Sequence, residues 1–373
     1  MKKACIYPSI ISFLFMAFCL SQKEGTNQES ILFFEILDES VPSWYPDDSK
    51  IVFASINHLG NSQLHTITLK NKVIEPIGAP EYTAKYPSCS SNSKMIYYLS
   101  DKSGIPEIHS LSLDGKDERQ ITFDGIKKKF PVISPNGKEI AFIRYPIKNK
   151  TTSELCVLNL RSGVVTVLHE DPLGYLGWPS WDSNGNYIYS YKLFNNSRNN
   201  ILRADRQAQN SEFLFTTEKG DTWNAQATPD GEGIYYLYNP TVKGEWGNNS
   251  EIRYRKNKSQ EDNLVFNGPR YENGLAISHD GSKIAFSSDI TGYYQLHILD
   301  TESRNVEQLT FQTEMELCTI IRKQGMDAGR KHYDTYKYQG KLFSEKAISY
   351  LIQDMERNLT NSDKAYLSRL IKE

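Results

Sequence analysis

Short apolar runs separated by polar turns recur along most of the chain. Six segments share one order: a Pro or small residue, a turn built around Asp or Asn, and then an apolar run such as Ile-Ala-Phe. The turn residue stands at Asp47, Asn92, Asn136, Asn184, Asp230 and Asp280, so that successive turns are 45, 44, 48, 46 and 50 residues apart. A repeat of this length holds about four short strands, which predicts six small antiparallel sheets over residues 41–311.

Four of the six turns carry Gly directly after the Asn or Asp. They are Asn136-Gly137, Asn184-Gly185, Asp230-Gly231 and Asp280-Gly281. Asn-Gly and Asp-Gly favour two-residue hairpin turns, because these residues tolerate the positive φ that both central positions can need. Asp47-Asp48 and Asn92-Ser93 keep half of this signal. Each turn is therefore predicted to join the first and second strands of its repeat.

Further apolar runs predict a third and a fourth strand after each hairpin. The third strands are predicted at Gln63–Leu69, Glu107–Leu113, Glu154–Leu160, Asn200–Ala204, Glu251–Arg255 and Gln295–Asp300, and fourth strands at Arg119–Thr122, Val164–Leu168 and Glu307–Thr310. One such sheet cannot bury both of its faces, whereas six sheets in a ring cover one another. The sequence thus predicts an all-β fold, a six-bladed β-propeller of four-stranded antiparallel blades.

Two repeats carry a more specific motif. Ser134–Phe142 (Ser-Pro-Asn-Gly-Lys-Glu-Ile-Ala-Phe) and Ser278–Phe286 resemble the TolB-type, WD-repeat-like propeller repeat, and the resemblance covers residues 41–311. It implies a periplasmic location and protein partners, such as an envelope lipoprotein or a peptide that enters the channel. TolB carries a separate N-terminal α/β domain, which the short segment before the first repeat does not match. The same repeat occurs in tricorn-like and dipeptidyl-peptidase-like propellers, so the resemblance indicates the fold better than the function.

Residues 1–21 have the pattern of an export signal. Lys2 and Lys3 precede the apolar run Ile10–Leu20, which is too short for an ordinary transmembrane helix. Met16-Ala17-Phe18-Cys19 resembles a lipobox, which implies cleavage before Cys19 and lipidation of that residue, although Phe18 stands where a small residue is usual. Cleavage after Ser21 by the ordinary signal peptidase is the alternative. Residues 22–40 are predicted to form a polar tether and a leading strand that adds to the ring.

Residues 312–373 change to helical periodicity. Helices are predicted at Glu314–Lys323, after Ser344, and after an N-cap at Asn361 or Ser362. The sequence therefore predicts a small α-helical extension, which packs against the propeller or docks a partner.

Composition and charge narrow the classes of function. A net charge of −2 argues against a nucleic-acid surface. The cysteines are widely spaced and lack a metal-binding or disulfide-framework pattern, and no cofactor motif is present. Gly-x-Ser-x-Gly and His-Glu-x-x-His motifs are absent, so no catalytic residues, cofactor or metal site are predicted. His65, His109 and His297 recur at one place in the third strands, where packing explains them better than a shared metal ion.

The candidate binding residues fall into two groups. Tyr86, Phe130, Trp178 and Trp223 begin the first strands of four repeats, where they either pack in the core or the channel wall, or line the mouth of the central channel and stack on a ligand. The second group comprises Lys127, Lys128, Lys129, Tyr175 and Trp246, which are predicted to lie on loops of one face. Trp246 is either an anchor for a partner or tucked into its blade. The lysines either contact a partner or form a solvated face.

Three functions are compatible with these patterns. The first is a non-catalytic binding scaffold in the bacterial cell envelope, whose partner is an envelope protein or peptide and whose membrane attachment is a lipid on Cys19. The second is a propeller enzyme that acts on carbohydrate or peptide, which needs carboxylates or histidines converging on one face. The third is a surface-exposed lipoprotein that binds external ligands.

Overall fold

The structure is a computed structural model of the 373-residue chain. It describes residues 41–310, apart from 57–60, 80, 146–151, 173–174, 194–198, 208–209, 215–219, 241–248, 258, 260, 269–270 and 289–293, together with residues 326 and 359–369. The predicted signal, tether and leading strand, and the first two predicted C-terminal helices, lie outside the described residues.

The described strands form six four-stranded antiparallel sheets, each built from four consecutive strands. The first three sheets contain β1(Ser43–Trp44), β2(Lys50–Ile56), β3(Ser62–Thr68) and β4(Ile74–Ile77); β5(Ala84–Ser88), β6(Met95–Ser100), β7(Glu107–Ser112) and β8(Glu118–Gln120); and β9(Lys127–Ile133), β10(Glu139–Tyr145), β11(Ser153–Asn159) and β12(Val165–Asp171). The last three contain β13(Tyr175–Trp181), β14(Tyr187–Leu193), β15(Asn199–Asp205) and β16(Ser211–Phe213); β17(Gly220–Ala227), β18(Gly233–Pro240), β19(Glu251–Lys256) and β20(Asp262–Asn267); and β21(Glu272–Ile277), β22(Lys283–Ser288), β23(Gln295–Asp300) and β24(Val306–Gln308).

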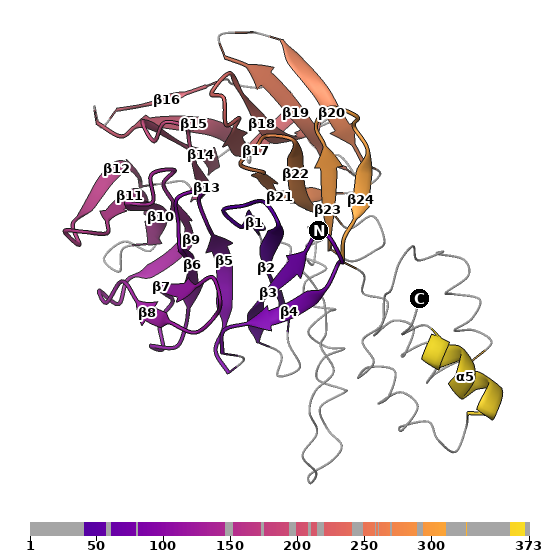
Figure 1. Cartoon of the computed structure of the whole chain (residues 1–373). Helices are drawn as coiled ribbons and strands as arrows, with labels where there is room; N and C mark the ends of the chain where they lie inside the picture. Colours follow the sequence, from indigo (N-terminus) through magenta and orange to yellow (C-terminus); the bar gives the residue numbers. More distant parts are fainter. Residues whose placement is uncertain are drawn as a thin grey trace, which may run out of the picture. The chain divides into compact units, whose positions relative to one another are not determined.

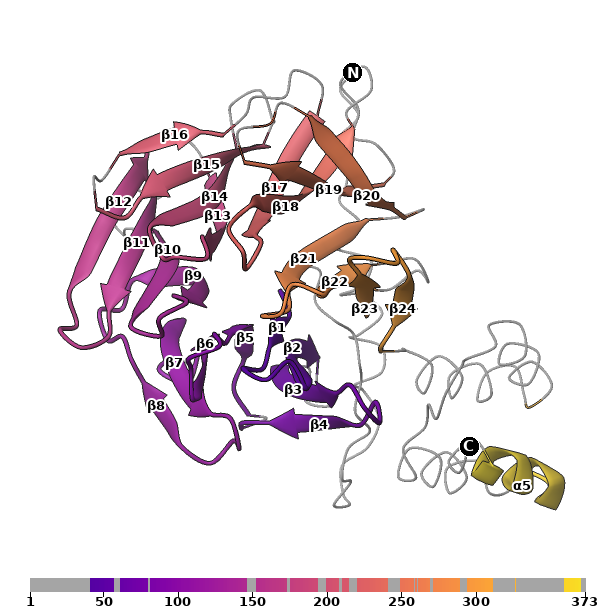
Figure 2. The same ribbon diagram turned by 45° about the horizontal axis from the view of Figure 1, so that its top comes forward.

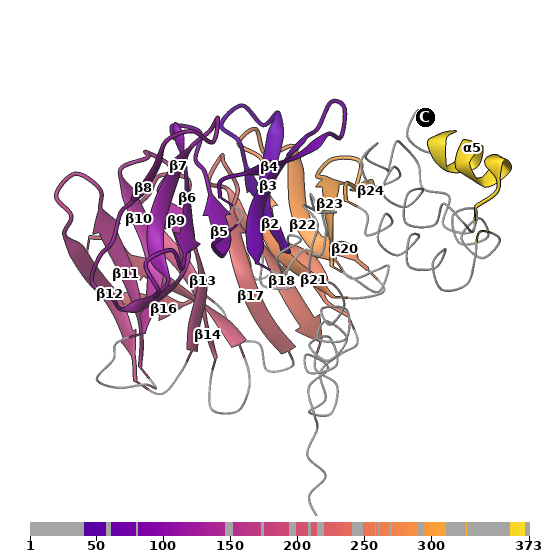
Figure 3. The same ribbon diagram turned by 90° about the horizontal axis from the view of Figure 1, so that it is seen from below.

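The six sheets are arranged as blades around a common axis, with β1, β5, β9, β13, β17 and β21 innermost (Figure 1). Figures 2 and 3 show the same ring from an inclined direction and from below. The predicted all-β six-bladed propeller is confirmed. Within the described strands no blade borrows a strand from another, so the first and last blades meet through side chains and loops.

The turn between the first two strands of each blade differs from the predicted type. In the third blade the Gly137 N–H donates to Ser134 O (2.9 Å), so Pro135 and Asn136 are the central residues and Gly137 alone has positive φ (69°). Proline fixes φ near −65°, which excludes a turn with two positive φ values and favours a type I turn followed by a left-handed Gly. Gly185, Gly231 and Gly281 adopt positive φ in the same way, as does Asp48 in the first blade.

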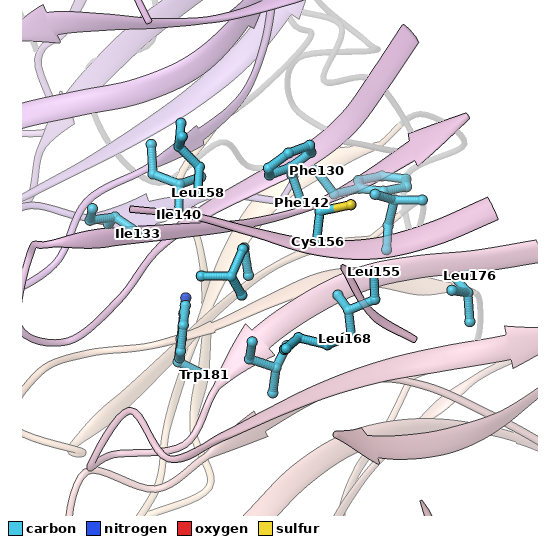
Figure 4. Packing of buried hydrophobic residues seen from close by; sticks show 14 of the residues in the cluster. Phe130, Ile133, Ile140, Phe142, Leu155, Cys156, Leu158, Leu168, Leu176 and Trp181 are labelled. Carbon is cyan, nitrogen blue, oxygen red and sulfur yellow. The ribbon is translucent and has the colours of Figure 1, made fainter. Parts of the chain in front are cut away.

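The hydrophobic core lies between adjacent blades. Second and third strands present continuous buried runs, such as Ile140–Ile143 on β10, because both faces of these middle strands are covered by neighbouring sheets. Phe142 on β10 and Trp181 on β13 belong to one buried cluster that spans three blades (Figure 4). This packing holds the inner strands around the axis.

One helix, α5(Asn361–Arg369), is described in the C-terminal part of the chain. Thr360 is its N-cap: the Asp363 N–H donates to Thr360 Oγ1 (3.1 Å), and Thr360 N–H donates to the Asp363 carboxylate (2.9 Å). The predicted cap at Asn361 or Ser362 was therefore late by one or two residues. Of the helices in the described part of the chain, none is long and apolar enough to cross a membrane.

Candidate binding channel

The innermost strand of five blades is interrupted by a bulge at the same height. Pairing with the second strand skips two residues in each, which are Tyr86-Pro87, Phe130-Pro131, Trp178-Pro179, Asn224-Ala225 and Gly274-Leu275. The first residue of each pair has a positive φ, between 42° and 65°. Proline suits the second position because it has no N–H to leave unpaired where the ladder is broken.

Four of these bulges place residues other than Gly in the left-handed region. Tyr86, Phe130, Trp178 and Asn224 all carry a Cβ, and three of them are bulky aromatics for which positive φ is unfavourable. Each such residue costs on the order of 1–3 kcal/mol. Strain concentrated at one level of the ring marks that level as a candidate functional site.

A cavity of about 130 Å³ lies along the axis at this level. All six inner strands contribute to its lining, through the bulge positions and the residues that follow them. No Asp, Glu, His, Lys or Arg is among the described residues that line it. The cavity is therefore uncharged, and it is smaller than the roughly 300–1,000 Å³ usual for small-molecule pockets. These properties suit a narrow, neutral segment of a ligand.

Aromatic rings form an arc along one side of the cavity. The ring centroids of Tyr86 and Phe130 are 4.6 Å apart, and those of Phe130 and Trp178 are 5.8 Å apart. Tyr191 on β14 continues the arc at 5.6 Å from Trp178. These separations are favourable for tilted or edge-to-face packing, so the rings support one another across three blades.

Polar side chains line the other parts of the cavity. Ser43 and Ser88 each accept a backbone N–H with Oγ, and no acceptor for their hydroxyl hydrogens occurs in the described part of the chain. The Gln226 side-chain amide likewise has no partner among the described residues. Burial raises the pKa of the Cys89 thiol to about 12, so this thiol is protonated and a poor nucleophile. The cavity thus offers hydrogen-bonding groups without acid or base chemistry.

A belt of hydrogen bonds ties the blades together next to the cavity. The pairs are Cys89 N to Ser43 Oγ, Ile133 N to Ser88 Oγ, Trp181 Nε1 to Val132 O, Ser180 Oγ to Ala225 O, Leu275 N to Asn224 Oδ1 and Trp44 Nε1 to Ala276 O. Each of the six blade interfaces has one of these bonds, worth about 0.5–1.5 kcal/mol net. The lining is therefore held in place from all sides.

The predicted aromatic positions are only partly equivalent. Tyr86, Phe130 and Trp178 occupy the bulges and line the cavity, which fits packing in the channel wall, and stacking on a ligand remains a prediction. Trp223 stands one residue before its bulge, where it is buried and donates Nε1–H to Asn273 Oδ1 (3.3 Å). Asn224 takes the equivalent place.

The lysine run is not on a loop. Lys127, Lys128 and Lys129 form the start of β9, and the predicted loop location is wrong. Lys128 is completely buried, with Nζ 2.8 Å from a Glu107 carboxylate oxygen, so it belongs neither to a solvated face nor to a partner contact. Lys127 is exposed, and Lys129 places Nζ 5.5 Å from the Phe130 ring centroid.

The remaining candidate residues are Tyr175 and Trp246. The predicted loop location is also wrong for Tyr175, which is the first residue of β13. Trp246 and Cys19 lie outside the described residues. A role in partner binding remains a prediction for Tyr175, Trp246, Lys127 and Lys129.

The three recurring histidines are buried in the third strands. The ring centroids of His65, His109 and His297 lie 5.5–5.9 Å from those of Phe53, Tyr98 and Phe286. Burial lowers the pKa of His65 and His297 to about 4 and also lowers the pKa of His109, so all three are neutral at pH 7. The packing interpretation is confirmed. Within the described ranges, no cluster of His, Cys, Asp or Glu could hold a metal ion.

The sequence patterns did not predict several of the residues that line the cavity. Ser43, Ser88, Asn224 and Gln226 look like ordinary strand residues, and a bulge in the inner strand lies at or next to three of them, Ser88, Asn224 and Gln226. The available signal was the aromatic-Pro pair in three successive repeats, which marks a break in strand pairing.

Six four-stranded blades around a central cavity define a six-bladed β-propeller. The family model of the TolB beta propeller domain matches residues 25–226, more than half of the chain, and the chain belongs to this family.

Solved structures agree on the fold. TolB from Acinetobacter baumannii has a TM-score of 0.58 at 17% identity, over 69% of this chain and 63% of that chain. A putative TolB from Agrobacterium tumefaciens has 0.54 at 18%, over 65% and 86%. A puromycin-hydrolyzing peptidase from Mycobacterium tuberculosis has 0.52 at 12%, over 74% and 45%. The chain thus spans less than two thirds of the first of these proteins. No curated protein matches it.

Proposed function

We propose that this protein is a non-catalytic binding scaffold of the bacterial cell envelope, which holds an extended peptide segment of a partner in its central channel. The observation that carries the proposal is the arc of Tyr86, Phe130 and Trp178, held in strained bulges around an uncharged cavity. Strain of this kind is retained where the surrounding fold imposes it, often at ligand sites.

The chemistry of the lining favours binding over catalysis. Hydrolysis or elimination needs a general acid or base within reach of the substrate, and the described lining residues include no carboxylate, imidazole or amine. Rings, hydroxyls and an amide are the groups that bind a peptide by stacking and hydrogen bonding. An enzyme that uses the loop faces remains the alternative, and its site would lie away from this cavity.

A substitution that blocks the channel with a large side chain, called the plug below, tests the proposal. Gln226→Trp adds a large ring at a lining position whose side chain has no partner among the described residues. The purified chain is incubated with a library of random-sequence, end-capped decapeptides, and captured peptides are quantified by mass spectrometry. We expect the plug to lower capture at least about tenfold, because the ring occupies space that the segment needs.

Two controls make this experiment specific. Lys138→Trp places the same ring on an exposed turn residue, and Gln226→Ala removes the amide without filling the cavity. Lys138→Trp should leave capture unchanged, and both tryptophan variants should keep the melting temperature of the parent. Equal capture by the plugged and parent chains would remove the channel as the binding site.

The envelope location is tested at Cys19. Expressed in a bacterium with labelled palmitate, the parent chain should carry the label, and Cys19→Ala should lose it, because the lipid is attached to that thiol. Globomycin, which blocks the lipoprotein signal peptidase, should leave a larger precursor. Cys5→Ala is the matched control, since Cys5 precedes the apolar run and should not affect labelling. An unlabelled parent chain would refute the lipid anchor.

A further inference from the structure

We infer that the segment bound in the channel is proline-rich and extended, an inference that rests on the proposed function and adds the chemical class of the ligand. Three features of the cavity lead to it: the donors of the lining that have no acceptor among the described residues, the spacing of the aromatic rings, and an indole N–H without an acceptor.

The lining offers hydrogen-bond donors that have no acceptor among the described residues. The hydroxyls of Ser43 and Ser88 have each accepted an N–H, which leaves each with its own O–H to donate and one further lone pair. Gln226 adds two N–H groups and one carbonyl. Proline has a carbonyl but no backbone N–H. The carbonyls of a run of prolines can therefore accept from these donors, and the run brings no backbone N–H that needs an acceptor, whereas an ordinary peptide brings one N–H per residue.

The aromatic arc matches the shape of such a segment. Polyproline II is a narrow helix without internal hydrogen bonds, and proline-rich ligands dock on aromatic-lined grooves by stacking their rings. Tyr86, Phe130 and Trp178 provide three successive rings at 4.6 and 5.8 Å. Because this helix is largely formed before binding, little conformational entropy is lost on entering a channel of about 130 Å³.

Trp178 differs from the other described tryptophans because its indole N–H has no acceptor in the described part of the chain. Trp44, Trp181 and Trp223 donate Nε1–H to Ala276 O, Val132 O and Asn273 Oδ1. The Nε1–H of Trp178 is closed off from solvent and has no acceptor in the described part of the chain. A buried donor without an acceptor is unfavourable. On binding, a turn of the indole toward the cavity would pair this N–H with a carbonyl of the ligand.

The test uses two peptides and two variants. An end-capped, proline-rich decapeptide and its counterpart with every proline replaced by alanine are titrated calorimetrically into the intact chain. We expect the proline-rich peptide to bind at least about tenfold more tightly. Trp178→Phe keeps an aromatic ring and removes the N–H, and should weaken binding of the proline-rich peptide about tenfold. The parent chain should change its Trp fluorescence on binding, and the variant should lose the part of this change that comes from Trp178. Trp181→Phe is the matched control, because its N–H is already bonded within the wall, and should change affinity less than about twofold.

The outcomes separate this inference from the function on which it rests. Equal affinity for the two peptides, or unchanged affinity in Trp178→Phe, overturns the proline-rich ligand and leaves peptide binding in place. If neither peptide binds while the decapeptide library still gives ligands that the Gln226→Trp variant does not capture, the proline-rich ligand is again ruled out and peptide binding in the channel stands. If the library gives no such ligands, the proposed function fails with it.

Discussion

Replacing Lys128 by alanine should destabilise the propeller by about 3–5 kcal/mol. The Lys128 side chain is fully buried, and its Nζ contacts the carboxylates of Glu107 and Asp124 and the carbonyl of Ile126. Glu107 also accepts the Gly125 N–H (2.7 Å) and the Thr122 hydroxyl. This network fixes the connection between the second and third blades, and removing the ammonium leaves a buried carboxylate without its counter-charge.

Urea unfolding of matched variants checks this value. Lys127→Ala, one position earlier and exposed, should change the free energy of unfolding by less than about 0.5 kcal/mol. Lys128→Met combined with Glu107→Gln should recover most of the loss, because the pair becomes neutral while the Gln carbonyl still accepts the Gly125 N–H. A cost below about 1 kcal/mol for Lys128→Ala would show that water reaches Glu107 and that the network contributes little.

Local sequence was sufficient to predict the repeat and the fold. The segment Ser134-Pro135-Asn136-Gly137 consists of residues that favour a turn, and the apolar runs beside it form the two strands β9 and β10. Six copies at nearly equal spacing leave a ring as the arrangement that buries every sheet. The type of turn was wrong because Asn-Gly alone suggests two positive φ values, whereas the preceding Pro135 shifts the turn by one residue.

The residues that line the channel could not be predicted from the residue type at single positions. A bulge in the inner strand changes which side chains face the axis, so Trp223 is buried beside Asn273 and Asn224 reaches the cavity. A run of three lysines predicts exposed side chains, because charged residues are rarely buried without a partner. The partner of Lys128 is Glu107, on a strand of another blade, and no local pattern connects the two.

Asp48→Ala should weaken the interface between the first and last blades by about 3 kcal/mol. Asp48 Oδ1 accepts the His279 N–H (3.0 Å) and faces His279 Nδ1 (2.8 Å), and Oδ2 accepts the Asp280 N–H (3.1 Å). Bonds to a charged acceptor contribute about 1.5–3 kcal/mol each when isolated, and less for neighbours that share one carboxylate. Alanine would also keep the positive φ of 55° at this position.

Asp48 and His279 meet where the ring closes, and both differ from the residues at the equivalent turn positions of the interface between the fifth and sixth blades. At that interface Gly281 has the position of Asp48 and Pro229 has the position of His279, and a Cβ built on Gly281 would lie 3.5 Å from the proline ring. Proline and glycine make only a packing contact, which suffices where the chain itself joins the two blades. A side-chain contact between Asp48 Oδ1 and His279 Nδ1 and two bonds from backbone N–H groups replace it, where no described strand crosses between blades.

Asp48→Gly separates hydrogen bonding from backbone strain. Glycine loses the same bonds but tolerates positive φ, so it should be about 1 kcal/mol less destabilising than alanine. Gly281→Ala is the converse control, because it adds the strain without removing a bond, and it should cost about 1 kcal/mol. Hydrogen exchange locates the effect: both Asp48 variants should speed exchange at the His279 and Asp280 amides, because the carboxylate that holds them is gone. Unchanged protection of these amides would mean that other contacts close the ring, such as the hydrogen bond from Trp44 Nε1 to Ala276 O.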